Sequence, residues 1–361
     1  MNNALHSLVL CSSIVSSPFV TQRSFIGINI HLNRFFGSFV KSLSNVNLHY
    51  SRFRSFLETP IVVTRYIDGM NIKNKQTVYT SNYVSVSFTI FENCYSSTIS
   101  GGAISINNAL CECNINDVVF KNCSSSANTK YPQRGDSLSG GAYLIIGKKT
   151  FLSRVCILRC FAHNWGPITY TYSTERLEQN LTSICHCNTI TQGFVNDNGY
   201  QLAIENNVTR NTISSTMASF LPSITGLFFR FILHKDNSIH NEIAHGQQEA
   251  RVHYCSFINN SINNYFVYEY DTITITECMF SKNNKLSVYL RNSYSVVLFS
   301  KCTYDVSNPQ SATTLSCSFV LNPPTLIMTP NTFCEHFYNI TSNNYPHHNQ
   351  FVQYVFLFIL Y

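Results

Sequence analysis

Apolar and polar residues alternate in several short stretches of the chain. Ile28, Ile30 and Leu32 are separated by polar residues, and the stretch 272–275 is Thr-Ile repeated twice. Because successive side chains of a β-strand point to opposite faces, this spacing gives each strand one apolar face. Strands of about five residues cannot bury such a face alone. The pattern predicts an all-β protein in which short strands pack on one another.

Similar strand sequences recur along the chain. INIHLNRF at 28–35 matches VNLHYSRF at 46–53 at an offset of 18, and IFENCYSS at 90–97 matches VFKNCSSS at 119–126 at an offset of 29. Each member of the second pair is followed by Gly-Gly-Ala and a short apolar stretch. Glycine adopts backbone conformations that other residues avoid, so these glycines are the predicted corners of the repeats. They are Gly101, Gly102, Gly140 and Gly141.

A third set of repeats carries cysteine. YCSFINN, ECMFSKN and KCTYDVS place Cys255, Cys278 and Cys302 at intervals of 23 and 24 residues, about one solenoid coil. Coils stacked about 4.8 Å apart pair their backbones and bury their apolar faces together. The repeats therefore predict a right-handed parallel β-helix, or β-solenoid, with like residues in ladders. The alternative is an antiparallel β-sandwich, which does not require like residues at such intervals.

We predict a single elongated domain, 1–361, with loop insertions, because no stretch is typical of a linker. The best-matched coils lie at 84–160, and the coils of the cysteine ladder lie at 252–305. Residues 1–60 are expected to form N-terminal coils or a cap. Over 165–250 the repeats are weak, and the polar stretches TERLEQN and HNEIAHGQQEARVH favour short helices or long loops. Irregular insertions are expected there.

Both ends of the chain carry apolar segments. Residues 4–20 are uncharged, but no Lys or Arg precedes them, so a weak signal segment and a first β-coil both stay open. The apolar tail 351–361 is shorter than the roughly 20 residues of a membrane helix. It is either a final strand or a truncated membrane segment. The spacer-like PHHNQ before it favours the second interpretation, which gives a membrane attachment through the C-terminus.

The composition argues against several classes of protein. Charged residues make up 12% of the chain, about half the usual share, and Asn, Ser, Thr and Tyr supply the polarity. The net charge is +6, but the 24 basic residues are scattered, whereas a nucleic-acid binder clusters them on one face. The 14 cysteines form no CxxC pair, which argues against a zinc ribbon. We expect no nucleic-acid partner, no metal and no cofactor.

Cysteines of neighbouring repeats are expected to stack on one another. Stacked Cα atoms about 5 Å apart lie within disulfide range, so the stacks are thiol ladders or disulfides. In an extended Cys185-His186-Cys187 both cysteines would face the same side, which also favours disulfides or a thiol ladder over a metal site. The candidates for the ladder or for disulfides are Cys94, Cys123, Cys255, Cys278 and Cys302.

Five sequons for N-glycosylation mildly favour a secretory route. The support is mild because a chain rich in Asn, Ser and Thr forms some sequons by chance. The candidate glycosylation sites are Asn122, Asn180, Asn207, Asn259 and Asn339.

The Gly-Gly-Ala elements resemble the repeats of polymorphic outer membrane proteins. GGAI at 101–104 and GGAY at 140–143 each follow a Phe-x-Asn element, and FINN at 257–260 fits the FxxN form. In that family, GGA[ILV] and FxxN tetrapeptides mark coils of a right-handed β-helix. Similar cysteine-rich repeats occur in surface families of protists. The resemblance is clear over about 84–160 and 252–305, although only two GGA elements occur.

The resemblance implies a non-catalytic, adhesin-like scaffold at the cell surface or outside the cell. No motif identifies its protein or glycan ligand, although Tyr265, Tyr268 and Tyr270 are candidate contact residues. Polysaccharide lyases and hydrolases also use the β-helix, so the alternative is a carbohydrate-active enzyme. Sugar cleavage needs paired carboxylates or a basic residue facing a groove, and the Asp residues lie far apart in the sequence. We expect no catalytic residue.

Overall fold

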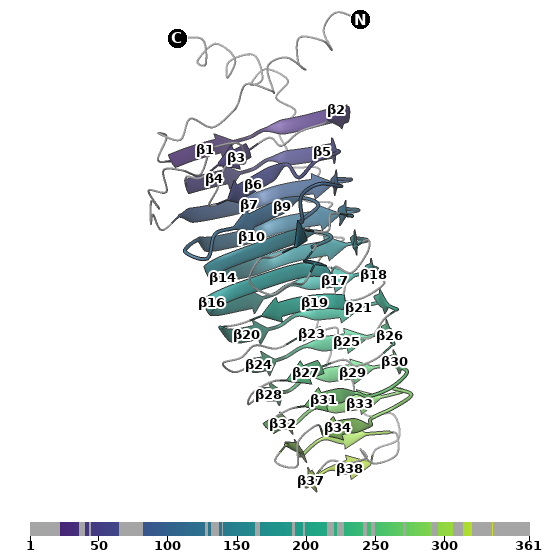
Figure 1. The fold of residues 1–361 in the computed structure, drawn as a ribbon. Helices are drawn as coiled ribbons and strands as arrows, with labels where there is room; N and C mark the ends of the chain where they lie inside the picture. Colours follow the sequence, from purple (N-terminus) through teal and green to yellow (C-terminus); the bar gives the residue numbers. More distant parts are fainter. Residues whose placement is uncertain are drawn as a thin grey trace, which may run out of the picture.

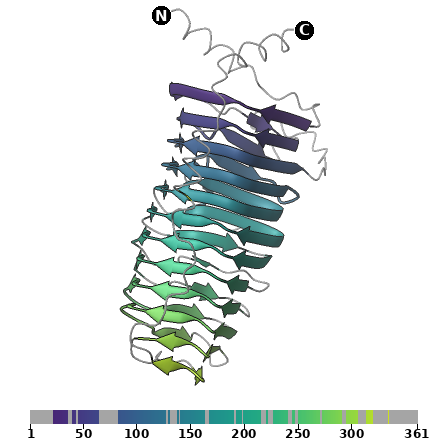
Figure 2. The ribbon, with the colours of Figure 1, turned by 180° about the vertical axis from the view of Figure 1, so that it is seen from behind.

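The protein is a parallel β-solenoid, as the sequence predicts. The computed structural model describes residues 22–35, 40–42, 45–64, 82–126, 129–130, 137–138, 140–162, 167–189, 192–197, 199–214, 220–221, 227–240, 244–246, 250–269, 272–290, 295–305, 313–319 and 334. Almost all described secondary structure is β-strand, and the coils stack along one long axis (Figures 1 and 2). Strands of successive coils pair in parallel.

Each coil has three main sides, which we name sheets I, II and III. Sheet I contains β1 (Gln22–Ile26), β4 (Asn45–His49), the first halves of β7 (Tyr83–Glu92) and β10 (Glu112–Lys121), the middle of β14 (Tyr143–Leu158), the second half of β16 (Pro167–Asn180), β20 (Tyr200–Ile204), β24 (Leu227–Arg230), β28 (Ala250–His253), β32 (Thr272–Thr276), β35 (Val296–Ser300) and β37 (Thr313–Leu315).

Sheet II follows sheet I in each coil. It contains β2 (Asn29–Phe35), β5 (Arg52–Phe56), the second halves of β7 and β10, the end of β14, β17 (Ser183–Cys185), β21 (Asn207–Thr209), β25 (Leu233–Lys235), β29 (Ser256–Ile258), β33 (Met279–Ser281), β36 (Thr303–Tyr304) and β38 (Ser318–Phe319). Sheet III contains β3 (Val40–Ser42), β6 (Ile61–Thr64), β9 (Ile104–Asn107), the starts of β14 and β16, β19 (Gln192–Asp197), β23 (Phe220–Leu221), β27 (Ala244–Gly246), β31 (Val267–Glu269) and β34 (Val288–Leu290).

Two small sheets complete the fold. Two-residue strands stack between sheets II and III, namely β8 (Tyr95–Ser96), β11 (Ser124–Ser125), β15 (Phe161–Ala162), β18 (Asn188–Thr189), β22 (Thr212–Ile213), β26 (Ser238–Ile239) and β30 (Ser261–Ile262). An antiparallel pair is formed by β12 (Thr129–Lys130) and β13 (Ser137–Leu138).

The strand register confirms two of the predicted repeats. In β7 and β10, Phe91 pairs with Phe120, an offset of 29. In sheet II, Ser256 pairs with Met279 and Met279 with Thr303, which gives the intervals of 23 and 24. The residue types that recur in the sequence therefore mark equivalent positions of successive coils.

The predicted offset of 18 between 28–35 and 46–53 is wrong. Ile30 pairs with Phe53, and Phe25 pairs with Leu48, so the coil has 23 residues here. The two similar segments lie on different sides of the coil, because the first is largely in sheet II and the second begins in sheet I. Strands of sheets I and II both alternate apolar and polar residues, so the two segments look alike in sequence without being equivalent positions of the coil.

The prediction of irregular insertions over 165–250 is also wrong for the described part of this range. Strands β16 to β28 continue the stack in register. TERLEQN forms the end of β16, where Leu177 and Gln179 are buried. Arg176 and Glu178 lie on the outward side and form an ion pair at 2.6 Å. Its polar character reflects that solvent-facing side rather than a helix or loop.

Two corners of each coil are built from left-handed residues. The first corner, between sheets I and II, is occupied by Gly27, Tyr50, Phe88, Asp117, Arg154, Leu181, Glu205, Phe231, Tyr254, Glu277, Lys301 and Ser316. The second corner, after sheet II, is occupied by Ser55, Asn93, Asn122, Arg159, His186, Arg210, Asp236, Asn259 and Lys282. A left-handed backbone costs roughly 1–2 kcal/mol for a residue with a Cβ, so the stack must stabilise each corner.

The column of side chains directly behind the second corner supplies part of that stabilisation. It runs through Cys94, Cys123, Cys160 and Cys187 and continues as Asn211, Asn237, Asn260 and Asn283. Each thiol donates to a carbonyl of the preceding coil, for example from Cys123 Sγ to Phe91 O at 3.5 Å. Each Asn side-chain amide makes two hydrogen bonds to backbone groups of the preceding coil, one as donor and one as acceptor. Asn237 Nδ2 donates to Val208 O, and its Oδ1 accepts from the backbone N–H of Asn211, both at 2.9 Å.

The Gly-Gly-Ala corners depend on close backbone contact as well as on dihedral freedom. Gly101 has a φ of +92°. A Cβ on Gly102 would lie 2.4 Å from the carbonyl oxygen of Gly141, and one on Gly140 would lie 1.8 Å from that of Tyr143. Gly102 therefore lets neighbouring coils approach where no side chain fits, whereas Gly140 permits a tight turn within its own coil.

Aromatic side chains stack along the interior of sheet II. Phe53, Phe91 and Phe120 are stacked with ring centroids 5.2 and 5.3 Å apart. In a later coil His234 occupies this column and pairs in register with Phe257. It is fully buried and lines a cavity of about 30 Å³, and its Nδ1 lies 2.9 Å from Asn237 Nδ2 and 3.1 Å from Asn260 Oδ1. Burial lowers the pKa of His234 to about 4.

Replacing Gly102 with Ala is expected to destabilise the fold by about 1–3 kcal/mol, because the added methyl group overlaps the backbone of the next coil. The measurement is the midpoint of urea unfolding. Gly27→Ala is the control, since nothing lies within 4 Å of its added Cβ and only the left-handed φ is penalised. Equal shifts for the two variants would contradict the close-contact explanation.

Stability is expected to fall as the pH drops from about 6.5 to about 4. The pKa of His234 is lower in the folded state than in the unfolded chain. Between these two pKa values the proton binds to the unfolded chain and not to the folded state, so the free energy of unfolding falls as the pH drops. Between pH 7 and pH 4.5, His234 is expected to lower the free energy of unfolding by roughly 2–3 kcal/mol. Urea titrations of wild type and His234→Phe at both pH values measure it. An equal pH dependence in the two proteins would show that His234 is not responsible.

Candidate functional site

The first corner carries a cluster of aromatic and charged side chains, which we name the aromatic corner. It consists of Arg230, Phe231, His253, Tyr254 and Glu277. Arg230 and His253 end β24 and β28, while the other three occupy the left-handed corner of three successive coils. These coils are 23 residues long, so the side chains line up along the stack.

The rings of the aromatic corner form a stacked surface under a cation. Phe231 and Tyr254 have centroids 5.4 Å apart and ring planes 21° apart. The guanidinium carbon of Arg230 lies 4.6 Å from the centroid of Phe231 and 5.6 Å from that of Tyr254. Phe228, on the outward side of β24, contacts His253 at 5.5 Å between ring centroids. A cation over a ring face is attracted by the ring quadrupole, which orders both groups.

Hydrogen bonding sets the charge at this corner. The hydrogen bond from Tyr254 to Glu277 lowers the pKa of the carboxyl and raises that of the phenol. Lys301 Nζ lies 3.6 Å from Glu277 Oε1 and reinforces the ionised carboxylate. The site therefore presents an uncharged phenol, an ionised carboxylate and two permanent cations beside flat rings. Such groups bind a ligand through stacking and hydrogen bonds.

A second aromatic pair lies on the same corner nearer the N-terminal end of the stack. Tyr50 and Phe88 are stacked at 4.9 Å with ring planes 9° apart, and they are 54% and 37% exposed. Further along, Arg154 is paired with Asp117 at 2.6 Å, and Leu181 is exposed. The first corner is thus a ridge with aromatic side chains toward both ends.

The five predicted glycosylation sites differ in exposure. Asn122 and Asn259 are exposed at the second corner, where their side-chain amides donate to Asn93 and Asp236. Asn180 is half-buried and Asn207 is buried. Asn339 lies outside the described residues. The geometry thus presents Asn122 and Asn259 to solvent and covers Asn207.

The predicted ladder cysteines fall into two columns. Cys94 and Cys123 belong to the column behind the second corner, together with Cys187 of the Cys-His-Cys stretch and with Cys160, which was not among the predicted ladder residues. Cys255, Cys278 and Cys302 lie directly behind the first corner, followed by Cys317. Their thiols contact backbone groups of neighbouring coils. The stretches ILRC and ICHC carried the missing signal, because their cysteines follow the same apolar position as Cys123.

The prediction that Cys185 and Cys187 face the same side is wrong. His186 between them has a φ of 55°, which turns the chain at the second corner. Cys185 therefore packs on the outer side of sheet II, whereas Cys187 packs inside the solenoid. Alternation of side chains holds only within an extended strand.

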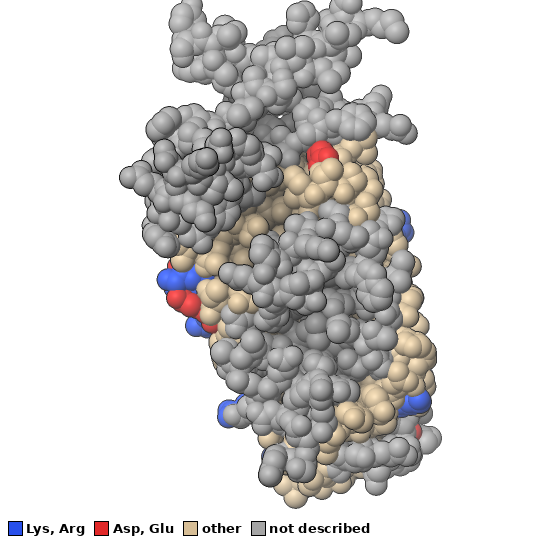
Figure 3. Space-filling view, viewed as in Figure 1, with Lys and Arg blue, Asp and Glu red and all other residues tan. Residues whose placement is uncertain are grey.

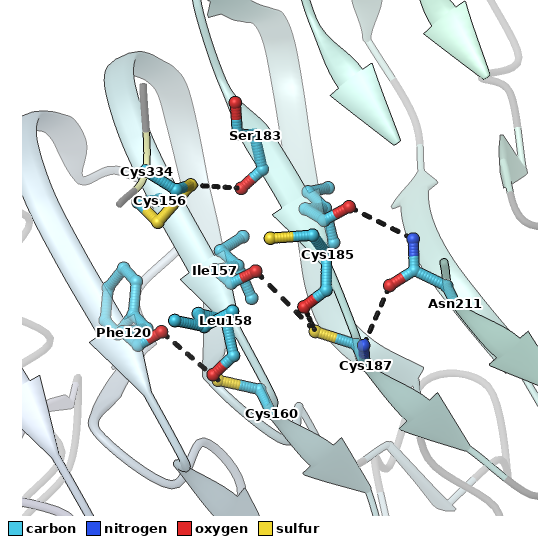
Figure 4. Close-up of a disulfide and its surroundings, with 11 residues drawn as sticks. Phe120, Cys156, Ile157, Leu158, Cys160, Ser183, Cys185, Cys187, Asn211 and Cys334 are labelled. Carbon is cyan, nitrogen blue, oxygen red and sulfur yellow. Dashed lines mark hydrogen bonds between the residues drawn. A yellow bond between two sulfur atoms is a disulfide. The ribbon is translucent and has the colours of Figure 1, made fainter. Parts of the chain in front are cut away.

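One disulfide is present among the described cysteines, and the sequence analysis did not identify it. Cys156 and Cys334 are bonded, with Cα atoms 5.3 Å apart, across a sequence separation of 178 (Figure 4). Cys334 lies outside every repeat, so no periodic signal could have indicated its partner.

Of the predicted tyrosine contacts, only Tyr265 has a described side chain. Its ring lies 5.0 Å from that of Tyr289, which is partly exposed. The side chain of Tyr268 and all of Tyr270 lie outside the described residues.

Within the part of the chain that the structure describes, no group of three or more His, Cys, Asp or Glu side chains is placed to hold a metal ion. Nor does a helix in this part have the length and apolar character needed to cross a membrane. No model of a known protein family matches the chain, and no curated protein or solved structure matches it.

Replacing Glu277 with Gln is expected to lower the pKa of Tyr254, because a neutral amide no longer favours the protonated phenol. The measurement is an NMR titration of ¹³C-labelled tyrosine. Glu205→Gln is a matched control, since Glu205 occupies the same corner three coils before Glu277. A pKa of Tyr254 that is unchanged in Glu277→Gln, or changed equally in the control, would contradict the proposed hydrogen bond.

Proposed function

We propose that the protein is a non-catalytic, adhesin-like scaffold that binds a protein or glycan ligand through its first corner. The observation that carries this proposal is the aromatic corner, where Phe231 and Tyr254 stack under Arg230 at positions fixed by the coil register. Rings held by a rigid backbone lose little conformational entropy when a ligand binds.

The low charge of the surface supports the same proposal. In the described part of the face seen in Figure 3, charged side chains are few and lie mainly toward the edges. The resemblance of the Gly-Gly-Ala elements to those of polymorphic outer membrane proteins adds support for a surface or secreted location. Exposure of the sequon residues Asn122 and Asn259 is compatible with a secretory route.

The alternative, a carbohydrate-active enzyme, has less support. A general acid for sugar cleavage needs a raised carboxyl pKa. The pKa of Glu277 is lowered by its hydrogen bond from Tyr254. The pKa of Glu92 is also lowered, because hydrogen bonds and charges from Lys121 and Arg54 outweigh its desolvation. Neither carboxylate therefore has the raised pKa that a general acid needs.

The test measures the affinity of the purified full-length protein for host cells, for extracellular matrix and for immobilised glycans. The combined variant Arg230→Ala/Phe231→Ala/Tyr254→Ala is expected to bind at least about tenfold more weakly, as for the loss of a central hot spot. The matched control, Arg159→Ala/His186→Ala/Arg210→Ala, removes three exposed side chains of the second corner and should bind within about twofold of wild type.

Unchanged binding by the first variant would exclude the aromatic corner as the contact surface. Surface biotinylation of the native protein tests the proposed location separately, and an unlabelled protein in intact cells would contradict it. Release of sugar fragments from a polysaccharide would favour the enzyme instead.

A further inference from the structure

Many residues on the outer side of sheet II are buried, although side chains there point away from the solenoid interior. Phe91 packs in the central core, so its neighbours Ile90 and Glu92 must point outward. Both are nevertheless inaccessible, with exposures of 0% and 7%. Ile90, Val119, Cys156 and Cys185 form one apolar cluster separate from the central core, which we name the upper patch.

A second outward cluster lies further along the same sheet. Leu233, Ile258 and Met279 pack together and are at most 9% exposed, and we name them the lower patch. Ser256 lies in the same outward column, and its buried Oγ has no hydrogen-bond partner among the described residues. Buried outward residues thus extend over many coils, which requires a cover along the stack.

Cys334 identifies the segment that reaches this surface. It is fully buried within the upper patch, bonded to Cys156, and its Sγ lies 3.7 Å from Ser183 O of the neighbouring coil (Figure 4). This residue comes from beyond the last strand, β38, and contacts coils in the middle of the solenoid.

The length of the chain constrains its path. Cys156 and Ser318 occupy the same outward column, seven coil steps apart through Ser183, Asn207, Leu233, Ser256, Met279 and Thr303. At about 4.8 Å per step the distance is roughly 34 Å. The 15 residues from Phe319 to Cys334 span at most about 50 Å, which is enough for this distance, and the straight line between the two positions crosses the lower patch.

The composition of the segment suits this surface. Residues 320–361 contain no Lys or Arg and a single acidic residue, Glu335, among many apolar ones. The N-terminal end of the outer side of sheet II already holds three cations, Arg52, Arg54 and Lys121, around the carboxylate of Glu92. A segment without positive charge adds no repulsion there.

We propose that the outer side of sheet II is a docking surface for this chain's own residues 320–361, fastened by the Cys156–Cys334 disulfide. A dithiol reductant releases the fastening: its two thiols supply two electrons and two protons, the S–S bond breaks into the thiols of Cys156 and Cys334, and the reductant becomes a disulfide. The apolar patches are then uncovered whenever the segment detaches.

The test measures alkylation of Cys185, which lies in the upper patch. Full-length wild-type protein, kept oxidised, is compared with the double variant Cys156→Ser/Cys334→Ser, in which Cys185 is the remaining cysteine of that patch. N-ethylmaleimide labelling is followed by mass spectrometry of peptides. The rate at Cys185 is expected to rise at least tenfold in the double variant. Cys317→Ser, which removes a cysteine outside the disulfide, should leave the rate unchanged.

Cys278 and Cys302 inside the solenoid report on the integrity of the fold. Their labelling should stay slow in every variant. Three results would overturn the proposal: a Cys185 rate that does not change in the double variant, a rise at Cys185 matched by equal rises at Cys278 and Cys302, or the lack of a linked Cys156–Cys334 peptide after non-reducing digestion. The first result would assign the cover to another part of the chain.

Discussion

Each coil of the solenoid must turn two corners with residues whose backbone is left-handed, and the rest of the structure depends on how that strain is offset. Most corner residues are not glycine, so each turn carries a steric cost. The cost is tolerable because the residue after the corner is buried and bonds to the neighbouring coil. The corner side chain itself is free to vary, which lets Tyr254 and Glu277 occupy equivalent positions. A fixed backbone with variable corner side chains is the property on which the proposed binding role of the first corner rests.

The column behind the second corner offsets the steric cost of the left-handed backbone with two kinds of side chain. In the earlier coils a thiol donates one weak bond, and stacked rings such as Phe91 and Phe120 supply packing beside it. In the later coils an amide such as that of Asn237 both donates and accepts. Sulfur is a weak donor, so the two halves of the stack rely on different balances of packing and hydrogen bonding. The aromatic corner lies in the half held by amides.

Much of the fold could be predicted from the sequence, because stacking requires like residues at equivalent positions. The pairing of Phe91 with Phe120 and the spacing of Cys255, Cys278 and Cys302 are direct results of that requirement. Prediction failed at the corners. A left-handed residue such as His186 reverses the alternation of side chains. Its residue type does not predict a left-handed backbone, because residues of many types occupy the corners.

The candidate sites were less predictable than the fold. Arg230, Phe231 and Tyr254 form a cluster only because two coils of 23 residues follow one another, and the polar stretches nearby concealed this regularity. The partner of Cys156 was hidden for another reason. Cys334 belongs to no repeat, so its position depends on the path of one segment rather than on periodicity.

The Cys156–Cys334 bond also has a mechanical consequence. It closes a covalent loop with a sequence separation of 178 that contains every strand from β15 to β38. When tension is applied between residues on either side of this loop, the force passes through the sulfur–sulfur bond and bypasses those coils. The residues inside the loop, which would be roughly 600 Å long if fully extended, therefore cannot be stretched by this force. A molecule that holds a ligand under load would keep these coils, including those that carry the aromatic corner, in their native shape while the bond lasts.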